Sequence, residues 1–337
     1  MANTMKAIQV PAAGAEFELV SRAIPEPKPN EILIHVKSCG ICHGDTIAKD
    51  GGHFPGLTWP RIPGHEVVGT VHALGSPDLR WKVGELVGVG WPGGHCGTCA
   101  FCMAGEFVAC ERGLVTGVTI DGGYAEYMVA RTDAVVALPD AFDVTVDAPL
   151  LCAGRTTFGA LQSSNLKGGD TVAVLGLGGL GHLAVQYASK LGYRVVAISR
   201  GSEKRSLAIR LGAHQYIDTS STDAVKALQG IGGANVILAT APNAKTVSAL
   251  VAGLARGGEM VIVSGIGEPL VIPGFLLLRG NLKVRGSVEG TIAPTIRFSH
   301  LCGVKPMVEL FSLEQAALGY RKMLDGTVHF RSVLTMH

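Results

Sequence analysis

Four cysteines lie within fifteen residues of one another, in the segment HCGTCAFCMAGEFVAC, and this cluster constrains the fold more than any other feature. They are Cys96, Cys99, Cys102 and Cys110. Four thiolates at such short spacing can surround one tetrahedral metal ion, as in structural zinc sites, where no coordination position is left open for chemistry. The spacing therefore predicts a zinc-bound lobe over about residues 92–112.

Three other interpretations of the cluster compete with zinc. Disulfides are disfavoured because residues 2–20 do not resemble a secretory signal and a chain of 337 residues needs no covalent staples. The ferredoxin run CxxCxxC continues with three residues and Cys-Pro, whereas here seven residues precede Cys110 and no proline follows it. Unrelated buried thiols rarely adopt this spacing. A structural zinc ion is favoured.

Composition excludes several classes of function. The net charge is +2 and aromatic residues make up 6% of the chain, which gives no basis for binding nucleic acid or an anionic membrane surface. No apolar run approaches the length of about 20 residues that a membrane-spanning helix needs. Reduced thiols acting as metal ligands predict a cytoplasmic location. A chain of this length is expected to form two domains.

The pattern of apolar residues changes along the chain. Residues 1–150 read as short strands and loops, for example 32–36 and 66–71, with no long helical period before about residue 145. From residue 170 onward, buried strands alternate with helices of about 10–15 residues, which predicts βαβ units and a parallel sheet. The expected elements of this part are strands at 171–175, 194–198, 234–239 and 259–263 and helices at 180–191, 203–211 and 245–255. A final strand is expected at 331–334.

A glycine-rich turn follows the strand at 171–175 and opens a helix. It reads Gly176-Leu177-Gly178-Gly179-Leu180-Gly181, which matches GxGxxG. In this context Gly176 permits the tight turn, Gly178 lets the backbone approach a pyrophosphate, and Gly181 lets the helix pack closely on the strand. The N-terminus of the helix supplies N–H groups and a positive dipole end for phosphate. The turn predicts a nicotinamide dinucleotide as cofactor.

The end of the second strand bears on which dinucleotide is preferred. An acidic residue there would accept a hydrogen bond from the ribose 2′-hydroxyl of NAD, but the segment reads Ile-Ser-Arg-Gly-Ser-Glu-Lys from residue 198. Ser199, Arg200 and Lys204 are therefore candidates to hold the 2′-phosphate of NADP. The alternative is that Arg200 and Lys204 form a solvated turn. NADP(H) is favoured over NAD(H).

Further segments contain metal-ligand residue types, and with the features above they establish a resemblance. The chain resembles the zinc-dependent alcohol dehydrogenases of the medium-chain dehydrogenase/reductase family, especially the microbial type, nearly from end to end. The motifs that carry the resemblance are CGICHGD (39–45), PGHEVVG (63–69), the four-cysteine segment, DGGYAEY (121–127), LLCAGRTTFGAL (150–161), GLGGLG (176–181) and GTVHFRSVL (326–334).

The resemblance implies an α/β fold with two domains. A Rossmann doubly wound parallel sheet is expected over residues 153–287. A GroES-like β-rich catalytic domain is expected over 1–152 and 288–337 and contains the four-cysteine lobe. The family also implies a homodimer or homotetramer, paired through the edge of the nucleotide-domain sheet.

The resemblance also assigns roles to single residues. It implies that Cys42, His65 and Cys152 hold a catalytic zinc, so that two zinc ions are expected per chain. Glu66 would approach that metal from behind, and Asp45 would orient His65. Residues implied near the cofactor or the substrate are His43 and Arg331 for the pyrophosphate, Thr156 beside the nicotinamide and Trp91 in the substrate pocket. Cys39 and Cys302 match no ligand position and are expected to be inert.

One departure from the family concerns the proton path. The family has Ser or Thr two residues after the first zinc cysteine, and its hydroxyl takes the substrate proton; here the residue is Gly44. The histidine that often continues the relay is replaced by Ile47. The proton route and the substrate are therefore open, and small Gly44 is expected to widen the substrate pocket.

The predicted function is a zinc-dependent alcohol dehydrogenase or aldehyde reductase, which moves a hydride between a small alcohol or aldehyde and a nicotinamide dinucleotide. One alternative is a zinc-free quinone or enone reductase on the same fold, which would lack the ligands. A second alternative is a nucleotide-binding relative without activity, which only Gly44 and Ile47 support.

Overall fold

The computed structural model describes residues 3–52, 54–288 and 290–336. Packing divides the chain into two compact units. The first comprises Met1–Cys152, Ile292–Arg297 and Lys305–His337, and the second comprises Ala153–Thr291 and Phe298–Val304. Among the described residues, no helix is both long and apolar enough to cross a membrane.

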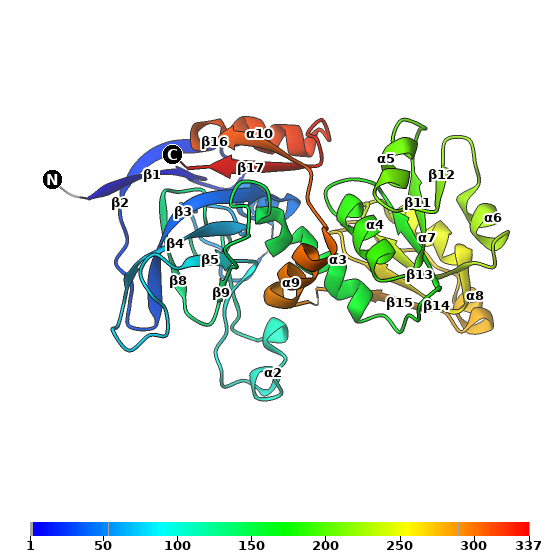
Figure 1. Cartoon of the computed structure of the whole chain (residues 1–337), viewed down its shortest axis with the longest axis horizontal. Coiled ribbons are helices and arrows are strands. Elements are labelled where there is room, and N and C mark those ends of the chain that lie inside the picture. Colours follow the sequence, from blue (N-terminus) through cyan, green and yellow to red (C-terminus); the bar gives the residue numbers. More distant parts are fainter. Residues whose placement is uncertain (1–2, 53, 289, 337) are drawn as a thin grey trace. The chain divides into compact units, whose positions relative to one another are not determined.

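The first unit is built on a seven-stranded sheet, in the order β16-β17-β3-β4-β5-β9 with β8 also paired to β3 (Figure 1). Its strands are β3 (Glu31–Ile41), β4 (Val67–Leu74), β5 (Leu86–Val89), β8 (Tyr127–Arg131), β9 (Val135–Ala137), β16 (Val308–Ser312) and β17 (Arg331–Thr335). β3 pairs with three neighbours, and most of its residues are buried, which places it in the interior of the sheet. Smaller strand pairs flank this sheet, namely β1 (Thr4–Gln9) with β2 (Glu18–Ala23) and β6 (Pro92–Gly94) with β7 (Leu114–Val115).

Helices in the first unit are short, as the sequence pattern predicts. They are η1 (His43–Asp45), α1 (Thr46–Asp50), α2 (Ala100–Met103), η2 (Phe107–Ala109), η3 (Ala148–Leu151), η5 (Leu313–Gln315) and α10 (Ala316–Leu324). The core of the unit collects apolar side chains from β1, β3, β4, β5 and β8 together with α10. The candidate metal ligands lie where these strands end in loops.

The second unit is a doubly wound parallel sheet of six strands in the order β12-β11-β10-β13-β14-β15. The strands are β10 (Thr171–Leu175), β11 (Arg194–Ser199), β12 (Gln215–Asp218), β13 (Ala234–Ala239), β14 (Leu254–Ile262) and β15 (Lys283–Gly286). Numbered from β10, the spatial order is 3-2-1-4-5-6, which is the order of the Rossmann fold. The predicted α/β class with a Rossmann sheet is confirmed, and the first unit is rich in strands, as expected.

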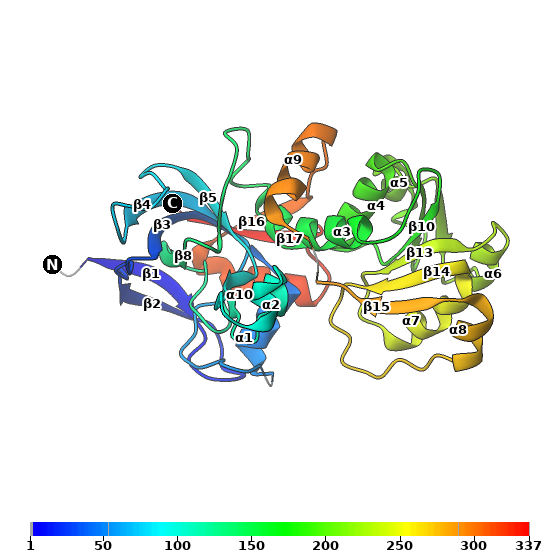
Figure 2. The same cartoon turned by 90° about the horizontal axis from the view of Figure 1, so that it is seen from below.

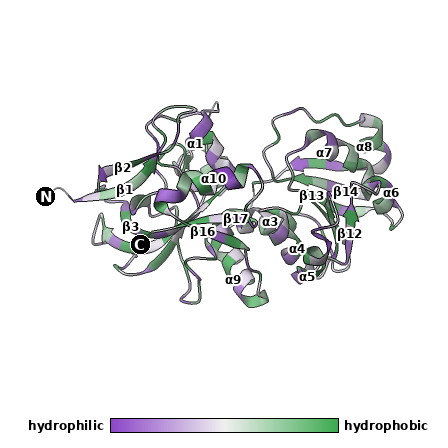
Figure 3. Ribbon diagram, turned by 90° about the horizontal axis from the view of Figure 1, so that it is seen from above, coloured by the Kyte–Doolittle hydropathy of each residue, from purple (hydrophilic) through white to green (hydrophobic). Residues whose placement is uncertain are grey.

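Helices cover both faces of this parallel sheet, with α4 and α5 on one face and α7 and α8 on the other (Figure 2). The helices of the unit are α3 (Ala153–Gln162), α4 (Gly181–Lys190), α5 (Arg205–Arg210), α6 (Ala224–Gln229), α7 (Ala244–Leu250), η4 (Val251–Gly253) and α8 (Gly274–Gly280). Hydrophobic and hydrophilic residues both occur along α4 and α7 (Figure 3), as expected for helices that bury one face on a sheet. All five residues of β10 are buried, which explains its uninterrupted apolar run.

Two boundaries differ from the sequence-based expectation. The helix expected over 245–255 ends at Leu250, because Leu254 already pairs with Ala234 and begins β14. The segment 288–337 was expected to belong wholly to the first unit, but residues 288, 290–291 and 298–304 pack with the second. There Arg155 donates to the carbonyl oxygens of Val288 and Gly290. α9 (Ile292–Cys302) is thus divided between the units, and its Phe298 packs on Phe158.

Candidate functional site

One group of metal-ligand residues lies where three secondary-structure elements of the first unit begin or end. β3 ends at Ile41, and Cys42 follows as the N-cap of η1. His65 lies two residues before β4, and Cys152 lies directly after η3. The donor atoms of Cys42, His65, Glu66 and Cys152 all lie within 4.8 Å of one another.

This donor set has the chemistry of a zinc site. The Sγ atoms of Cys42 and Cys152 are 3.8 Å apart, and both residues are partly buried. His65 is fully buried, and its Nε2 has no hydrogen-bond partner among the described residues. A buried ring nitrogen without a partner costs free energy unless a metal or a donor satisfies it. Two thiols and one imidazole whose Nε2 has no partner therefore fit a zinc ion.

Asp45 connects the backbone of this site to the ring of His65. Its Oδ1 lies 2.9 Å from Nδ1 of His65, and its Oδ2 accepts from the backbone N–H of Cys42 at 2.9 Å. The hydroxyl of Tyr124 donates to the same Oδ2 at 2.8 Å. All these side chains except Cys42 are buried. The predicted contact between Asp45 and His65 is thus present. Tyr124 lies in the motif DGGYAEY, but the sequence did not predict its contact with Asp45.

Glu66 and Arg331 form a buried ion pair next to the thiols. Arg331 Nη2 donates to Oε1 of Glu66, and the two side chains are 6% and 0% exposed. Burial raises the pKa of Glu66 to about 7, although the charge of Arg331 opposes this shift. Gly40 makes room for the carboxylate, because a Cβ there would lie 1.8 Å from its Oε2. Arg331 was expected at the pyrophosphate; its observed partner is Glu66, and contact with a cofactor stays a prediction.

The two thiols of this cluster, Cys42 and Cys152, differ in the direction in which their pKa values are shifted. Hydrogen bonding with Cys152 and the nearby imidazole hold the pKa of Cys42 well below its usual range, against the effect of burial. The same hydrogen bond and burial raise the pKa of Cys152. The backbone N–H of Gly44 also points at Sγ of Cys42, at 3.5 Å. Cys42 is therefore the sulfur that most readily carries negative charge.

Trp91 and Gly44 form one wall next to His65. The ring of Trp91 meets the ring of His65 edge to face, with centroids 4.8 Å apart and an interplanar angle of 88°. A Cβ at position 44 would lie 3.0 Å from Cζ3 of Trp91 and 3.1 Å from Cε1 of His65. The aromatic ring therefore occupies much of the space beside Gly44. Trp91 thus lies against the glycine, and the expectation that Gly44 widens the substrate pocket stays a prediction.

The second group of donors is the four-cysteine lobe, which lies between β6 and β7. The Sγ atoms of Cys96, Cys99, Cys102 and Cys110 lie within 4.8 Å of one another. Backbone N–H groups of Thr98 and Cys99 donate to Sγ of Cys96 at 3.5 and 3.4 Å. These hydrogen bonds lower the pKa of Cys96 to about 5. Converging sulfurs that accept N–H bonds fit a tetrahedral zinc site.

The glycine turn of the second unit connects β10 to α4. Gly176 has φ of +96°, and a Cβ on Gly181 would lie 1.9 Å from the carbonyl oxygen of Gly176, so both positions require glycine. Apart from its chain neighbours, no heavy atom of the described residues lies within 4 Å of a Cβ placed on Gly178, which leaves the backbone open to a ligand. Gly179 and Leu180 complete the turn, and Leu180 is the N-cap of α4. This arrangement suits a pyrophosphate.

The end of β11 carries the residues considered for the 2′-phosphate. β11 ends at Ser199, Arg200 is exposed, and Nζ of Lys204 donates to the carbonyl of Leu177 in the glycine turn at 3.0 Å. A carboxylate does lie beside this end, because Asp218 of β12 pairs with Ser199 in the parallel ladder.

The sequence offered no signal for this neighbour, since strand pairing alone brings Asp218 there. Its Oδ1 accepts from the backbone N–H groups of Gly201 and Ser220, both at 2.9 Å, and from the Ser220 hydroxyl at 2.6 Å. These hydrogen bonds lower the pKa of Asp218. The carboxylate is therefore already engaged in holding the turn after β11.

The remaining predicted residues are placed without contacts that define a role. His43 is exposed in η1, and Thr156 is half-buried in α3. Cys39 is fully buried, and Cys302 is half-buried at the end of α9; neither belongs to a donor cluster among the described residues. The expectation that both are inert stays a prediction.

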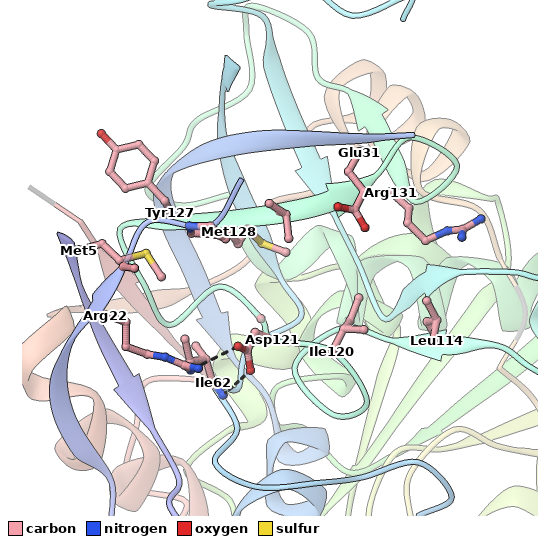
Figure 4. Close-up of a pocket in the computed structure, with 14 residues that line it drawn as sticks. Met5, Arg22, Glu31, Ile62, Leu114, Ile120, Asp121, Tyr127, Met128 and Arg131 are labelled. Carbon is pink, nitrogen blue, oxygen red and sulfur yellow. Dashed lines mark hydrogen bonds and ion pairs between the residues drawn. The ribbon is translucent and has the colours of Figure 1, made fainter. Parts of the chain in front are cut away.

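A cavity of about 170 Å³ lies elsewhere in the first unit, between the β1–β2 hairpin and β8 (Figure 4). None of the eight clustered metal-ligand residues lines it. At its rim Arg22 pairs with Asp121 at 3.3 Å, and Asp121 also accepts from Arg61 at 2.8 Å. Because its carboxylate is already neutralised by these cations, we assign no ligand to this cavity.

Comparisons with known proteins agree with the geometry. Residues 28–140 match the model of the alcohol dehydrogenase GroES-like domain, and residues 179–301 match that of the zinc-binding dehydrogenase family. The chain is 42% identical to alcohol dehydrogenase patD of Penicillium expansum, covering 99% of this chain and 98% of the relative. It is 37% identical to an alcohol dehydrogenase of Geobacillus stearothermophilus, covering 92% and 93%.

Solved structures show the same likeness. The structure of CAD from Helicobacter pylori complexed with NADP(H) superposes with a TM-score of 0.86 at 26% identity, covering 100% of this chain and 99% of that one.

Proposed function

The chain belongs to the zinc-dependent alcohol dehydrogenases of the medium-chain dehydrogenase/reductase family, and on this basis we propose that Cys42, His65 and Cys152 hold the zinc ion of its active site. The enzyme is an oxidoreductase that interconverts alcohols and carbonyl compounds with a nicotinamide cofactor. The observation that carries the proposed ligand set is the buried Nε2 of His65, which lacks a partner among the described residues and lies beside two thiols.

The two bound groups supply the reactive chemistry: zinc polarises the oxygen of the substrate as a Lewis acid, and the nicotinamide gives or accepts the hydride. The protein's own residues orient and balance this site. Asp45 accepts from Nδ1–H of His65, which leaves Nε2 directed at the metal position. The positive charge of Arg331 compensates the negative charge of Glu66, which lowers the free-energy cost of burying this carboxylate next to two sulfurs.

We assign the four-cysteine lobe to a second, structural zinc ion. All four positions of a tetrahedron are then filled by sulfur, which leaves none for substrate. The ion would contribute to folding of residues 92–112 and not to turnover. Eight cysteines without a disulfide among them also suit a reducing compartment, and we place the enzyme in the cytoplasm.

NADP(H) is the proposed preferred cofactor. The support is that β11 ends in Ser199 and Arg200, and that the nearby carboxylate of Asp218 is engaged by Gly201 and Ser220. Arg200 is exposed and carries the positive charge that a 2′-phosphate needs.

Self-association is also proposed, through the β15 edge of the parallel sheet. Large apolar side chains of the adjoining segment are exposed there, with Val271 at 78%, Phe275 at 72% and Leu278 at 78%. Exposed apolar groups next to an open sheet edge are a common feature of protein interfaces.

The direct test of the proposed function is a panel of alcohols and aldehydes assayed with NADP(H) and with NAD(H) at the nicotinamide absorbance. We expect turnover of small alcohols and aldehydes with a higher kcat/KM for NADPH. Ser199→Asp should reverse this preference, because a carboxylate repels the 2′-phosphate and accepts from the 2′-hydroxyl of NAD. Thr222→Asp, which adds the same charge at an exposed position, serves as the control. A parent enzyme that prefers NADH would refute the role of Arg200.

A further inference from the structure

The carboxylate of Asp45 is held by three donors in the first unit. His65 Nδ1 lies 2.9 Å from one oxygen, while the backbone N–H of Cys42 at 2.9 Å and the hydroxyl of Tyr124 at 2.8 Å share the other. Asp45 is 1% exposed, and His65 and Tyr124 are fully buried. These three donors are therefore held away from bulk solvent.

The position of the Tyr124 hydroxyl is fixed by its backbone and by its ring. The backbone N–H of Tyr124 donates to the carbonyl of Pro63 at 3.0 Å, and its carbonyl accepts from Ile8 at 2.8 Å. The ring packs against Gly64, where a Cβ would come within 2.4 Å of Cδ1. Gly64 lies directly before His65 in the chain. The same contacts therefore locate the phenol and the segment that carries the imidazole.

Burial, and after it the charge of Asp45, raises the pKa of Tyr124, so its hydroxyl stays protonated and acts only as a donor towards this carboxylate. A carboxylate that receives two donors on one oxygen is held in one orientation, and its other oxygen is aimed at Nδ1 of His65. That contact selects the tautomer in which Nε2 carries the lone pair.

We propose that Tyr124 is a positioning residue for the catalytic metal: its hydroxyl fixes the carboxylate of Asp45, which in turn fixes His65 as a ligand. This inference rests on the proposed zinc set of Cys42, His65 and Cys152. The hydroxyl of Tyr124 donates to Asp45 and is not one of the clustered donors, so the effect of removing this hydroxyl is transmitted through Asp45.

The test compares two tyrosines of the same core, Tyr124→Phe and Tyr320→Phe. Both rings pack on Phe17, with centroids 6.4 and 5.1 Å away, and both side chains are buried. The hydroxyl of Tyr320 has no hydrogen-bond partner among the described residues, so its loss controls for removal of a buried oxygen.

Each variant is loaded with Co²⁺, and its release to a chelator is followed by the cobalt–thiolate absorption band. Partners of metal-bound histidines are typically worth about 10- to 100-fold in metal affinity. We therefore expect Tyr124→Phe to speed metal release from the Cys42 site by about 10- to 100-fold. Release from the four-cysteine lobe should be unchanged, and Tyr320→Phe should behave as the parent at both sites.

A double-mutant cycle separates positioning from a general structural effect. In an Asp45→Asn background, Tyr124→Phe should cause no further acceleration, because the path runs through the carboxylate. Equal release rates for Tyr124→Phe and the parent would overturn the proposal. If Tyr124→Phe does not fold, Asp45→Asn alone decides: unchanged metal release would overturn the proposal, since no path would remain.

The proposed function fails in a distinguishable way. A parent protein that binds metal only in the four-cysteine lobe would overturn the catalytic site and the role of Tyr124 together. A parent that binds metal at both sites, with a Tyr124→Phe variant of unchanged release rate, would overturn only the positioning role.

Discussion

Removal of the positive charge of Arg331 should destabilise the first unit by an amount that the structure allows us to estimate. Arg331 is 6% exposed and its partner Glu66 is 0% exposed, so Arg331→Met leaves a carboxylate buried without a cation. Breaking a buried pair in this way typically costs about 3–5 kcal/mol of unfolding free energy. The double variant Arg331→Met/Glu66→Gln removes the uncompensated charge and should recover most of that loss.

The sign of the pH dependence follows from Glu66. Burial already raises its pKa to about 7, and the charge of Arg331 lowers it, so Arg331→Met raises it further. A folded-state pKa above the unfolded value means that the folded variant binds an extra proton between the two values. The stability deficit of Arg331→Met relative to the parent should therefore shrink as the pH falls from the higher pKa of Glu66 in the variant to its pKa of about 7 in the parent, by up to about 1.4 kcal/mol per pH unit.

The assay for this prediction is urea unfolding followed by tryptophan fluorescence. All three tryptophans, Trp59, Trp81 and Trp91, lie in the first unit, so the signal reports on that unit alone. The control is Lys6→Met, which breaks a pair with Glu314 whose side chains are 59% and 45% exposed, so its loss should change the unfolding free energy little. Equal, small losses for Arg331→Met and Lys6→Met would refute the reasoning.

Three further predictions concern other parts of the chain. Gly44→Ser should destabilise the first unit by about 1–3 kcal/mol, because the serine Cβ would lie 3.0 Å from Trp91. Trp91→Leu in the same chain should relieve this destabilisation. Additive shifts of the melting temperature for the two substitutions would contradict the prediction. Cys102→Ser should remove one zinc and expose residues 92–112 to hydrogen exchange with turnover retained, and unchanged protection there would contradict a structural zinc. Leu278→Glu should lower the mass measured by light scattering, whereas Leu310→Glu, at a site 52% exposed, should not; an unchanged mass for both would exclude the β15 edge.

The features that the sequence predicted best are those in which all the residues involved lie within one short segment. The buried strand at 171–175 is observed over the same residues, because an apolar run before a glycine turn leaves few alternatives. The glycine turn itself requires glycine at 176 and 181 for reasons of φ and close approach that are local to the turn. The four-cysteine cluster lies within one loop, so the spacing of its residues in the sequence was enough to predict it.

The contacts that sequence did not predict join residues far apart in the chain. Tyr124 reaches Asp45 across 79 positions, and Arg331 reaches Glu66 across 265. Asp218 arrives beside Ser199 through strand pairing. Trp91 lies against Gly44. No residue period or motif records such pairs, because they depend on how strands and loops from distant parts of the chain are brought together in each unit.

The most direct test of the central claim is the zinc content of the parent and of Cys42→Ala, measured together with alcohol-dependent reduction of the nicotinamide cofactor. Cys42 is proposed to hold only the catalytic ion, while the four-cysteine lobe lies in a separate loop. The account predicts two zinc ions per chain for the active parent, and one zinc ion with no turnover for Cys42→Ala. A fully active parent with a single zinc ion, or a Cys42→Ala variant that retains turnover, would contradict it.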